Sequence, residues 1–364
     1  MQSYLKDKVD FSQVERVLIV KLQHLGDVLL TSPVFSTLKR QYPHLQIDAL
    51  VYADTACMLQ GNPHVDTIFT IDRAWKQDFL LKLQQEWRLY QALKNRNYQL
   101  LIGMTDRMRA VWLARFLRPT YSVAQKYPNK RGQFWRNSFS HLYNQPPLPR
   151  HTVETHLDAL RRIGVYPHAE DKLLSMPVPA DVEQNIAELL ATKQLGNAGF
   201  VVIHPASRWM FKGWNIDGFA MVLAELGRRG IQVIMVSGPD QAERDYVQNI
   251  LQARPHNAID LSGRLTLPEL AALIARARCF IGLDSVAMHM AAAVGTPCIA
   301  LFGPSSDKSW HPWQVPHRVI SSPFSCRPCG LDGCGNGKVS DCLQAIPPSE
   351  VIDAALALMQ GNNA

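Results

Sequence analysis

Short hydrophobic runs alternate with longer amphipathic segments through the first half of the chain. The runs are typical of strands buried on both faces, and the longer segments have the period of helices. The pattern predicts strands at residues 17–22, 47–52, 67–71 and 100–104, and helices at residues 28–42, 77–94 and 107–117. Strand–helix alternation of this kind favours parallel βαβ units.

The second half of the chain repeats the alternation. It predicts strands at residues 200–204, 231–237, 279–283 and 297–302, and helices at residues 215–229, 240–251, 267–276 and 285–294. Three prolines interrupt any helix between the halves, at Pro167, Pro177 and Pro179. A chain of 364 residues is also long enough for two domains. We therefore expect an α/β protein of two βαβ domains joined near residues 165–179.

Composition places the chain among globular proteins, with 47% hydrophobic and 19% charged residues. Its first ten residues are polar rather than signal-like, and no apolar run reaches the ~20 residues that span a bilayer. We therefore expect a cytoplasmic protein.

Charge is divided unevenly between the two halves. Residues 1–150 hold 21 Lys or Arg against 11 Asp or Glu, whereas residues 151–364 hold 17 against 20. Such asymmetry concerns partners rather than fold. The first half is expected to meet an anion, which leaves a phosphorylated substrate, a membrane surface or a nucleic acid as candidates.

The loop after the first predicted strand contains Gly26 and Asp27. Ligands of open parallel sheets bind beyond the carboxyl ends of the strands, so such loops are the place to look for chemistry. Gly26 allows a close approach of the ligand, and the Asp27 carboxylate could accept a proton from an attacking hydroxyl. Spacing alone favours a plainer alternative, in which Asp27 caps the following helix.

Two loops of the second half carry groups suited to a diphosphate. One contains the Ser207 hydroxyl and the Lys212 ammonium group, which can hold phosphate oxygens and neutralise a leaving group. The other has Asp284 and Ser285 at a helix start, with His289 one turn further on the same face. Taken singly, the first loop also fits solvated cations, and the second fits a helix cap with a buried core histidine.

Three common motifs are missing from the sequence. There is no Asp-x-Asp pair, no Gly-x-Gly-x-x-Gly and no P-loop. Their absence argues against a metal-dependent nucleotide-sugar enzyme, a dehydrogenase and an ATPase. We expect neither a catalytic metal nor a cofactor.

Residues 106–140 are rich in both basic and aromatic residues. Such a composition can hold phosphorylated sugars, lie on an anionic membrane or bind nucleic acid. We interpret residues 107–117 as a helix with its apolar face inward, followed by a loop. Within that loop, Lys126, Lys130 and Arg131 are candidates for contact with an acceptor or a membrane.

Four cysteines follow near the C-terminal end, at Cys326, Cys329, Cys334 and Cys342. In a cytoplasmic chain they are more plausibly thiols or metal ligands than disulfides. A Cys₄ zinc site is one alternative, but the spacing does not match a two-knuckle ribbon. Reduced structural thiols are therefore favoured.

Taken in chain order, these loops resemble a known family. Gly26-Asp27, then Lys212-Gly213-Trp214, Asp284-Ser285 with His289, and Phe302-Gly303-Pro304 are similar to the ADP-heptose:lipopolysaccharide heptosyltransferases, glycosyltransferase family nine. The resemblance covers roughly residues 17–313. The first loop and the cysteine-rich tail most resemble the branch of the family that adds the third, branching heptose.

The resemblance implies a GT-B fold, with two Rossmann-like domains facing across a cleft. Residues 1–170 would bind the acceptor, residues 171–345 would bind the ADP-sugar, and residues 346–364 would form a C-terminal helix. Heptose transfer would invert the anomeric carbon and need no metal. The donor is ADP-heptose, and the acceptor is the inner-core glycolipid at the cytoplasmic face of the inner membrane, where the protein would be peripheral. No nucleic acid partner is expected.

The resemblance also implies roles for single residues. Asp27 aligns with the base, and Gly26 with its acceptor-side turn. The donor-side residues are Ser207 and Lys212 for the diphosphate, Gln241 for ribose, Leu265 for adenine, Asp284 for heptose, Ser285 for phosphate, and His289. Ala206 and Val286 depart from the family pattern, where a second hydroxyl and a glycine are usual.

Three other functions remain open at this stage. The chain could add the second heptose rather than the third. It could be a GT-B sugar-nucleotide epimerase, which would turn over the donor without a glycolipid. It could also be a basic membrane-surface protein without turnover, in which case Lys212 and Asp284 would be dispensable.

Overall fold

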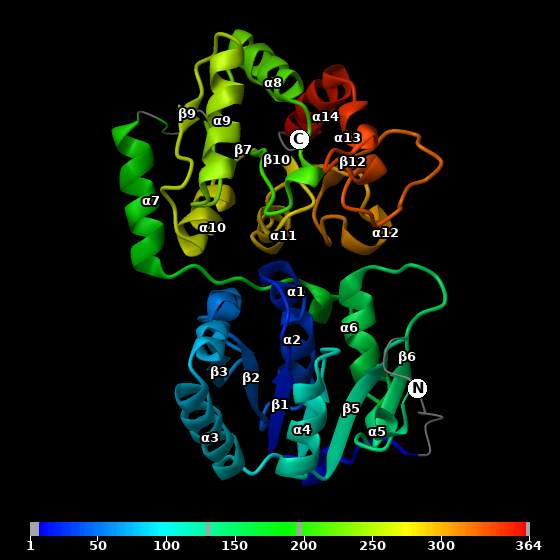
Figure 1. The fold of residues 1–364 in the computed structure, drawn as a ribbon. Coiled ribbons are helices and arrows are strands. Elements are labelled where there is room, and N and C mark those ends of the chain that lie inside the picture. The colour runs from blue at the N-terminus through cyan, green and yellow to red at the C-terminus, as the bar shows by residue number, and fades with distance from the viewer. Residues whose placement is uncertain (1–6, 129–131, 194, 196–198, 362–364) are drawn as a thin grey trace. The chain divides into compact units, whose positions relative to one another are not determined.

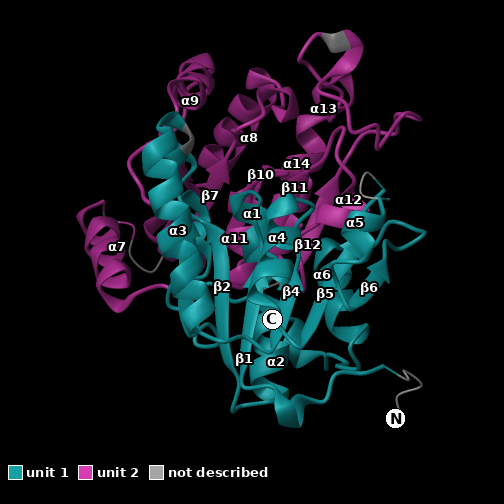
Figure 2. Ribbon diagram, turned by 60° about the horizontal axis from the view of Figure 1, so that its bottom comes forward, with its two compact units in different colours: residues 1–176 teal, residues 177–364 magenta. Residues whose placement is uncertain are grey.

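The chain folds into two compact units, residues 1–176 and residues 177–364, in the computed structural model (Figure 2). The structure describes residues 7–128, 132–193, 195 and 199–361. The division falls between Met176 and Pro177, six residues beyond the expected domain boundary and within the expected joint. No described helix is both long and apolar enough to cross a bilayer.

Unit 1 is a parallel six-stranded sheet of order β3-β2-β1-β4-β5-β6 (Figure 1). Its strands are β1 Arg16–Val20, β2 Gln46–Tyr52, β3 Thr67–Ile71, β4 Leu100–Gly103, β5 Tyr121–Lys126 and β6 His141–Asn144. Its α-helices are α1 Leu25–Leu29, α2 Ser32–Gln41, α3 Phe79–Asn95, α4 Met108–Leu117, α5 Gln133–Arg136 and α6 Thr152–Arg161. Its 3-10 helices are η1 Phe11–Gln13, η2 Ala53–Met58, η3 Arg73–Gln77 and η4 Glu170–Lys172.

Strand residues pointing to opposite faces of this sheet are both buried. Leu18 and Val20 of β1 join Leu101 of β4 in a core cluster that includes Val111 of α4 and Trp135 of α5. The alternate residues of β1 are also buried. This is why the strands read as continuous apolar runs rather than as an alternating pattern.

The helix predicted at residues 28–42 is wrong as a single element. The structure has two helices there, α1 and α2, which are separated at Leu30 and Thr31. Pro33 is the physical reason, because it lies in the first turn of α2, has no N–H to donate and blocks a continuous helix. The break leaves α1 as a short turn that carries Asp27.

The expectation that a loop follows residue 117 is also wrong. Residues 121–126 form strand β5, which pairs in parallel with β4 and β6, and Gln133–Arg136 forms the short helix α5. Ser122 and Gln125 are buried in β5, so its polar residues hid the strand from a reading based on apolar runs.

Unit 2 is a second parallel six-stranded sheet, of order β12-β11-β10-β7-β8-β9. Its strands are β7 Phe200–His204, β8 Gln232–Met235, β9 Ile259–Asp260, β10 Cys279–Leu283, β11 Cys298–Leu301 and β12 His317–Ile320. Its α-helices are α7 Ala180–Thr192, α8 Ile216–Arg228, α9 Gln241–Ala253, α10 Leu267–Ala275, α11 Val286–Ala293, α12 Asp307–Trp310, α13 Asp341–Gln344 and α14 Pro348–Gly361. Its 3-10 helices are η5 Met210–Lys212 and η6 Cys334–Asn336.

The C-terminal helix α14 is an integral part of unit 2. Val351, Ala355 and Met359 are buried at successive four-residue steps, so they lie on one face of the helix. That face joins the core cluster of Trp214 and the strands β7, β10 and β11. The C-terminal helix was expected within residues 346–364, and its described part, α14, therefore packs in the core of unit 2.

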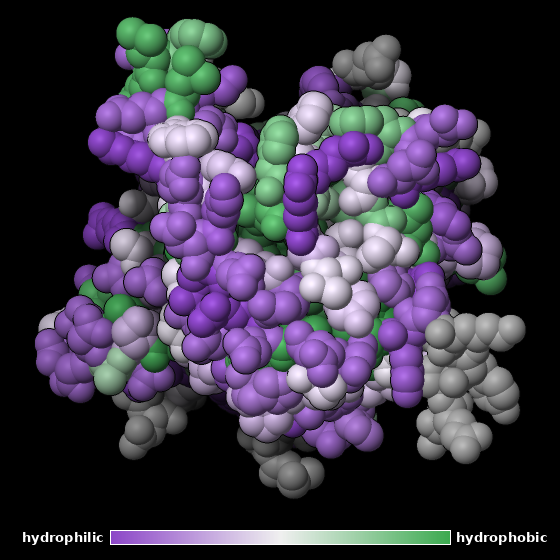
Figure 3. All heavy atoms as spheres, turned by 90° about the horizontal axis from the view of Figure 1, so that it is seen from below, coloured by the Kyte–Doolittle hydropathy of each residue, from purple (hydrophilic) through white to green (hydrophobic). Residues whose placement is uncertain are grey.

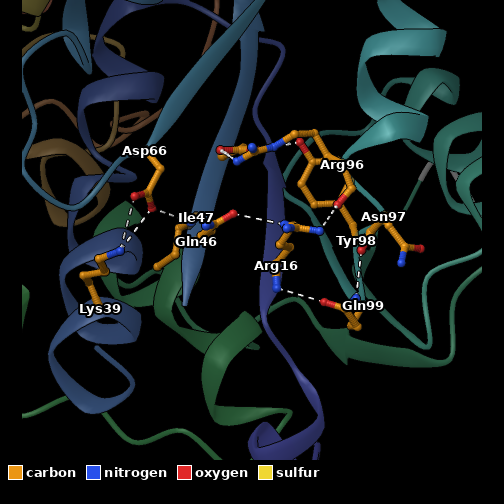
Figure 4. Close-up of polar contacts among 10 residues, drawn as sticks. Arg16, Lys39, Gln46, Ile47, Asp66, Arg96, Asn97, Tyr98 and Gln99 are labelled. Atoms are coloured by element: carbon orange, nitrogen blue, oxygen red, sulfur yellow. Dashed lines mark hydrogen bonds and ion pairs between the residues drawn. The ribbon is translucent and has the colours of Figure 1, made fainter. Parts of the chain in front are cut away.

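A polar network joins the amino-terminal ends of the strands of unit 1 (Figure 4). Asp48 of β2 is fully buried and accepts hydrogen bonds from Arg96 Nε at 2.8 Å and from the Tyr98 hydroxyl at 2.7 Å. Arg16 of β1 donates to Gln46 Oε1 at 3.0 Å and to the Arg96 carbonyl at 3.1 Å. These contacts tie β1, β2 and the entry to β4 at the edge opposite to the one where ligands bind.

Arg96→Met is expected to destabilise the protein by about 3 kcal/mol, because it leaves the buried Asp48 carboxylate without its cation. Arg228→Met is the matched control, since Arg228 pairs with Glu225 on an exposed helix face and such pairs contribute little. Urea unfolding of both variants measures the difference. Equal stability of the two variants would contradict this role of Arg96.

Candidate active site

Lys21 lies at the carboxyl end of β1 and is almost fully buried. Its ammonium nitrogen is 3.7 Å from Asp27 Oδ1, and the Asp27 side chain keeps 20% of its surface exposed. At this distance the Lys21 ammonium group attracts the carboxylate without forming a short hydrogen bond to it. Burial lowers the pKa of Lys21, and the negative charges of Asp27 and then Asp106 oppose that shift.

His156 of α6 fixes the position of Lys21. Its Nδ1 lies 3.0 Å from the carbonyl oxygen of Leu30, which can only accept, so Nδ1 carries the proton and donates it. Nε2 then has a free lone pair and accepts a hydrogen bond from the Lys21 ammonium group at 2.9 Å. Burial lowers the pKa of His156 well below its ordinary value, and the charge of Lys21 lowers it further. The ring is therefore neutral, as this hydrogen-bond pattern requires.

Two further groups belong to this end of the sheet. Asp106 lies in the loop after β4, and Tyr127 directly follows β5, so both come after strands that neighbour one another. Burial raises the pKa of Tyr127, and the charges of Asp106 and Asp27 add to the rise. The carboxyl edge of unit 1 thus brings together two carboxylates, a buried lysine, a tyrosine and a neutral histidine.

The interpretation of Asp27 as a helix cap is wrong. The N-cap of α1 is His24, and Asp27 is the third residue of the helix. A carboxylate in the first turn still interacts favourably with the helix dipole. The Asp27 side chain keeps 20% of its surface exposed, so a ligand can reach the carboxylate.

In unit 2 the predicted loops meet where β7 and β10 end side by side. Lys212, in the helical turn η5 after β7, donates to Asp284 Oδ2 at 2.6 Å. Asp284 directly follows β10, and the two side chains keep only 21% and 10% of their surfaces exposed. A partly buried pair of this kind places one cation and one carboxylate at the edge where ligands of parallel sheets bind.

Ser285 is the N-cap residue of α11, but its side chain makes no capping hydrogen bond. Its hydroxyl oxygen is buried, and it has no hydrogen-bond partner within the part of the chain that the structure describes. Buried polar atoms are nearly always paired, so this hydroxyl suits a ligand oxygen. His289, one turn further along α11, is buried with its ring centroid 6.2 Å from that of Trp310.

Ser207 is buried in the loop between β7 and η5. Its hydroxyl accepts one long hydrogen bond, at 3.4 Å, from the Trp209 amide, so it can still donate to another group. His204, at the end of β7, donates a hydrogen bond from Nδ1 to the Ala206 carbonyl at 3.0 Å. Burial lowers the pKa of His204, and the charge of Glu243 opposes the shift.

Gln241 and Leu265 stand apart from these buried contacts. Gln241 is exposed in the first turn of α9, where its amide donates to Asp245 at 2.6 Å, and Asp240 caps that helix. Glu243 of the same turn accepts from the Gly238 amide at 2.9 Å and so fixes the loop after β8. Leu265 is half-buried between β9 and α10. Their predicted ribose and adenine contacts stay predictions.

The remaining candidates divide between described and undescribed positions. Gly26 lies inside α1, and Lys126 is the exposed last residue of β5. Lys130 and Arg131 lie outside the described residues. Cys326, Cys329 and Cys334 are exposed thiols, whereas Cys342 is buried. No metal-binding cluster of three or more His, Cys, Asp or Glu residues occurs among the residues described.

Sequence reasoning missed the residues that act through long-range contacts. His156 and Lys21 are in contact although they are 135 positions apart in the sequence, and no local pattern indicates such a pair. Lys21 itself was visible only as the polar end of an apolar run. A charged residue at the end of a fully buried strand was the available signal, because a buried charge requires partners.

Comparison with known proteins now decides the family. The sequence pattern described as glycosyltransferase family 9 (heptosyltransferase) matches residues 86–340, most of the chain. The chain belongs to this family. The matched region includes Lys212, Asp284 and Ser285, whereas Asp27 precedes it.

Individual relatives agree with this membership. The chain is 36% identical to the lipopolysaccharide heptosyltransferase 3 of Escherichia coli over 294 residues, which is 79% of this chain and 84% of the relative. It is 28% identical to the heptosyltransferase 1 of Pseudomonas aeruginosa over 88% of this chain and 87% of the relative.

Solved structures of the family share the fold. A family 9 glycosyltransferase from Veillonella parvula superposes with a TM-score of 0.81 at 22% identity, covering 95% of this chain and 97% of the other. Heptosyltransferase WaaC of E. coli, solved with ADP, superposes with a TM-score of 0.70 at 17% identity, covering 94% and 99%. The fold is GT-B, as predicted, and the enzyme is a family 9 glycosyltransferase.

The neutral state of His156 predicts acid sensitivity. Below pH about 6.5 the unfolded histidine binds a proton that the folded one does not, so stability falls with falling pH by up to ~1.4 kcal/mol per pH unit. His156→Gln keeps an acceptor for Lys21 but does not titrate, so we expect a smaller loss of melting temperature on acidification. Replacement of the exposed His168 by Gln is the control. Identical pH dependence in wild type and His156→Gln would contradict a buried neutral ring.

Proposed function

We propose that this enzyme transfers heptose from ADP-L-glycero-D-manno-heptose to the inner core of lipopolysaccharide, and that it adds the third, branching heptose. The observation that carries the proposal is the 36% identity to the E. coli heptosyltransferase 3 across 79% of the chain. Relatives named heptosyltransferase 2 are 22–23% identical over comparable lengths.

The acceptor would be activated in unit 1. Asp27 accepts the proton of a heptose hydroxyl as that oxygen attacks the anomeric carbon of the donor. The new C–O bond forms as the bond between the anomeric carbon and the diphosphate breaks, which inverts the configuration. Lys21, held by His156, keeps the carboxylate in place through charge attraction at 3.7 Å. Gly26, Lys126, Lys130 and Arg131 are proposed as acceptor-side residues.

The donor would be held in unit 2. The Lys212 ammonium group and the Ser207 and Ser285 hydroxyls are proposed to bind the diphosphate and stabilise the negative charge that develops on departing ADP. Asp284 would accept hydrogen bonds from heptose hydroxyls while it orients Lys212 at 2.6 Å. Gln241 and Leu265 are proposed for ribose and adenine, and His289 for the donor side. These groups would stabilise the leaving group without a metal ion.

Heptosyltransferase 2-type transfer is the second candidate, supported by the relatives of that name. The two candidates differ in the acceptor: the first requires a core that already carries two heptoses, and the second requires one that carries a single heptose. The proposal places the enzyme in the cytoplasm, peripheral to the inner membrane, where such a glycolipid is exposed.

The deciding experiment measures ADP release from ADP-heptose with inner-core acceptors that carry one, two or three heptoses. We expect release only with the two-heptose acceptor, together with a mass gain of one heptose. Transfer to the one-heptose acceptor would favour the second candidate. Release without any acceptor would contradict transfer and indicate hydrolysis or epimerase-like turnover of the donor.

A further inference from the structure

Helix α3 exposes apolar side chains that a soluble helix would normally bury. Of its 17 residues only Leu93 is buried. Leu80, Leu83 and Trp87 keep 75%, 53% and 61% of their surfaces exposed. Their spacing of three and four residues places them in one stripe along the helix.

Rings from α4 and α5 extend this stripe. The ring centroids of Trp87 and Tyr90 are 5.8 Å apart, and those of Tyr90 and Phe116 are 6.3 Å apart. Phe116 stacks on Trp112 at 5.7 Å, and Trp112 meets Phe134 at 5.4 Å. We call these five residues the aromatic surface. Figure 3 shows clusters of hydrophobic side chains on a face that is otherwise largely hydrophilic.

This surface overturns the expectation that the helix at residues 107–117 turns its whole apolar face inward. Val111 and Ala114 of α4 do pack in the core, but Trp112 and Phe116 remain 46% and 58% exposed. The helix is therefore apolar on two faces, only one of which is needed for folding. Contiguous exposed apolar surface on a soluble protein marks an interaction site.

Basic residues are concentrated in the segment of the chain that carries the aromatic surface. From Phe79 to Arg136 the sequence holds 12 Lys or Arg against two Asp or Glu. The Arg115 guanidinium lies 4.4 Å from the centre of the Phe134 ring, and the Lys94 ammonium group lies 5.8 Å from that of Tyr90. Lys82 and Arg88 are exposed on α3 and make no ion pair within the described part of the chain.

We propose that the aromatic surface and its basic rim bind the headgroup region of an anionic phospholipid bilayer. Tryptophan and phenylalanine favour the boundary between headgroups and acyl chains, and each nearby Lys or Arg adds attraction to anionic lipid. A second copy of this chain fits less well, because a symmetric dimer would bring this patch against itself and oppose like charges. The surface belongs to unit 1, which holds Asp27.

The inference rests on the proposed function, since it gives the enzyme a reason to be at a membrane: its acceptor is a lipid-anchored sugar. Binding through α3, α4 and α5 would retain unit 1 at the surface where that glycolipid is concentrated. It would raise the encounter rate with the acceptor and leave the donor site unchanged.

The test is co-sedimentation of the full chain with phosphatidylcholine vesicles that contain or lack phosphatidylglycerol. Wild type is expected to bind the anionic vesicles and to be released by salt. The triple variant Trp87→Gln, Trp112→Gln and Phe116→Gln, and the charge variant Lys82→Glu with Arg88→Glu, are each expected to lose binding by about tenfold or more. Phe324→Gln, an exposed ring in unit 2, is the matched control and should bind as wild type does.

Heptose transfer to a deacylated, water-soluble core acceptor separates this inference from the proposed function. The variants are expected to keep wild-type transfer to that acceptor and to lose it with acceptor embedded in vesicles. A wild type that transfers heptose to the soluble acceptor but binds no anionic vesicle would overturn the membrane surface alone. A wild type that binds vesicles but transfers no heptose would leave the surface standing and remove the proposed function.

Two other results would also overturn the inference. Vesicle binding by the triple variant equal to that of wild type would place the membrane contact elsewhere. The wild type could instead bind no vesicles and form a concentration-dependent dimer that the triple variant does not form. That result would show that the aromatic surface binds a second copy of the chain.

Discussion

A buried ammonium group at the carboxyl end of β1 is the constraint around which unit 1 is organised. A lysine without solvent needs compensation, and Lys21 finds it in the lone pair of His156 at 2.9 Å and in the Asp27 carboxylate at 3.7 Å. The first contact requires a neutral imidazole whose other nitrogen donates to the Leu30 carbonyl. The proton on His156 Nδ1 thus links helix α6 to the break between α1 and α2, and the lone pair on Nε2 links the same helix to the end of β1. The Asp27 carboxylate stays partly open to solvent.

Polar groups at the two ends of the strands in unit 1 differ in how completely they are hydrogen-bonded. At the amino-terminal edge, Asp48 has its cation and its hydroxyl donor, so the network is closed and serves stability. At the carboxyl edge, Asp27 keeps oxygens open to a ligand. Unit 2 follows the same rule, because the hydroxyl of Ser285, the residue after Asp284, is buried without a partner among the described residues. Incompletely satisfied groups at strand ends are what a binding site requires.

Elements that depend on local sequence could be predicted, whereas contacts that depend on tertiary packing could not. Strands such as β7 and β10 were predictable to the residue, because burial on both faces makes them continuous apolar runs. Strand β5 was not, since buried Ser122 and Gln125 interrupt its pattern. The pairing of Lys21 with His156 was also out of reach, because nothing local connects residues 135 positions apart. The aromatic surface escaped for a related reason: periodicity marks an apolar face but not whether anything covers it.

The central claim is that Asp27 performs the proton transfer and takes no part in holding the donor. The most direct measurement is single-turnover heptose transfer by Asp27→Asn, with ADP-heptose affinity measured on the same protein and Lys212→Met as the contrasting variant. The account predicts that Asp27→Asn binds donor as wild type does and transfers heptose at least ~10²-fold more slowly, whereas Lys212→Met weakens donor binding. Transfer by Asp27→Asn at the wild-type rate, or loss of donor binding in that folded variant, would contradict it.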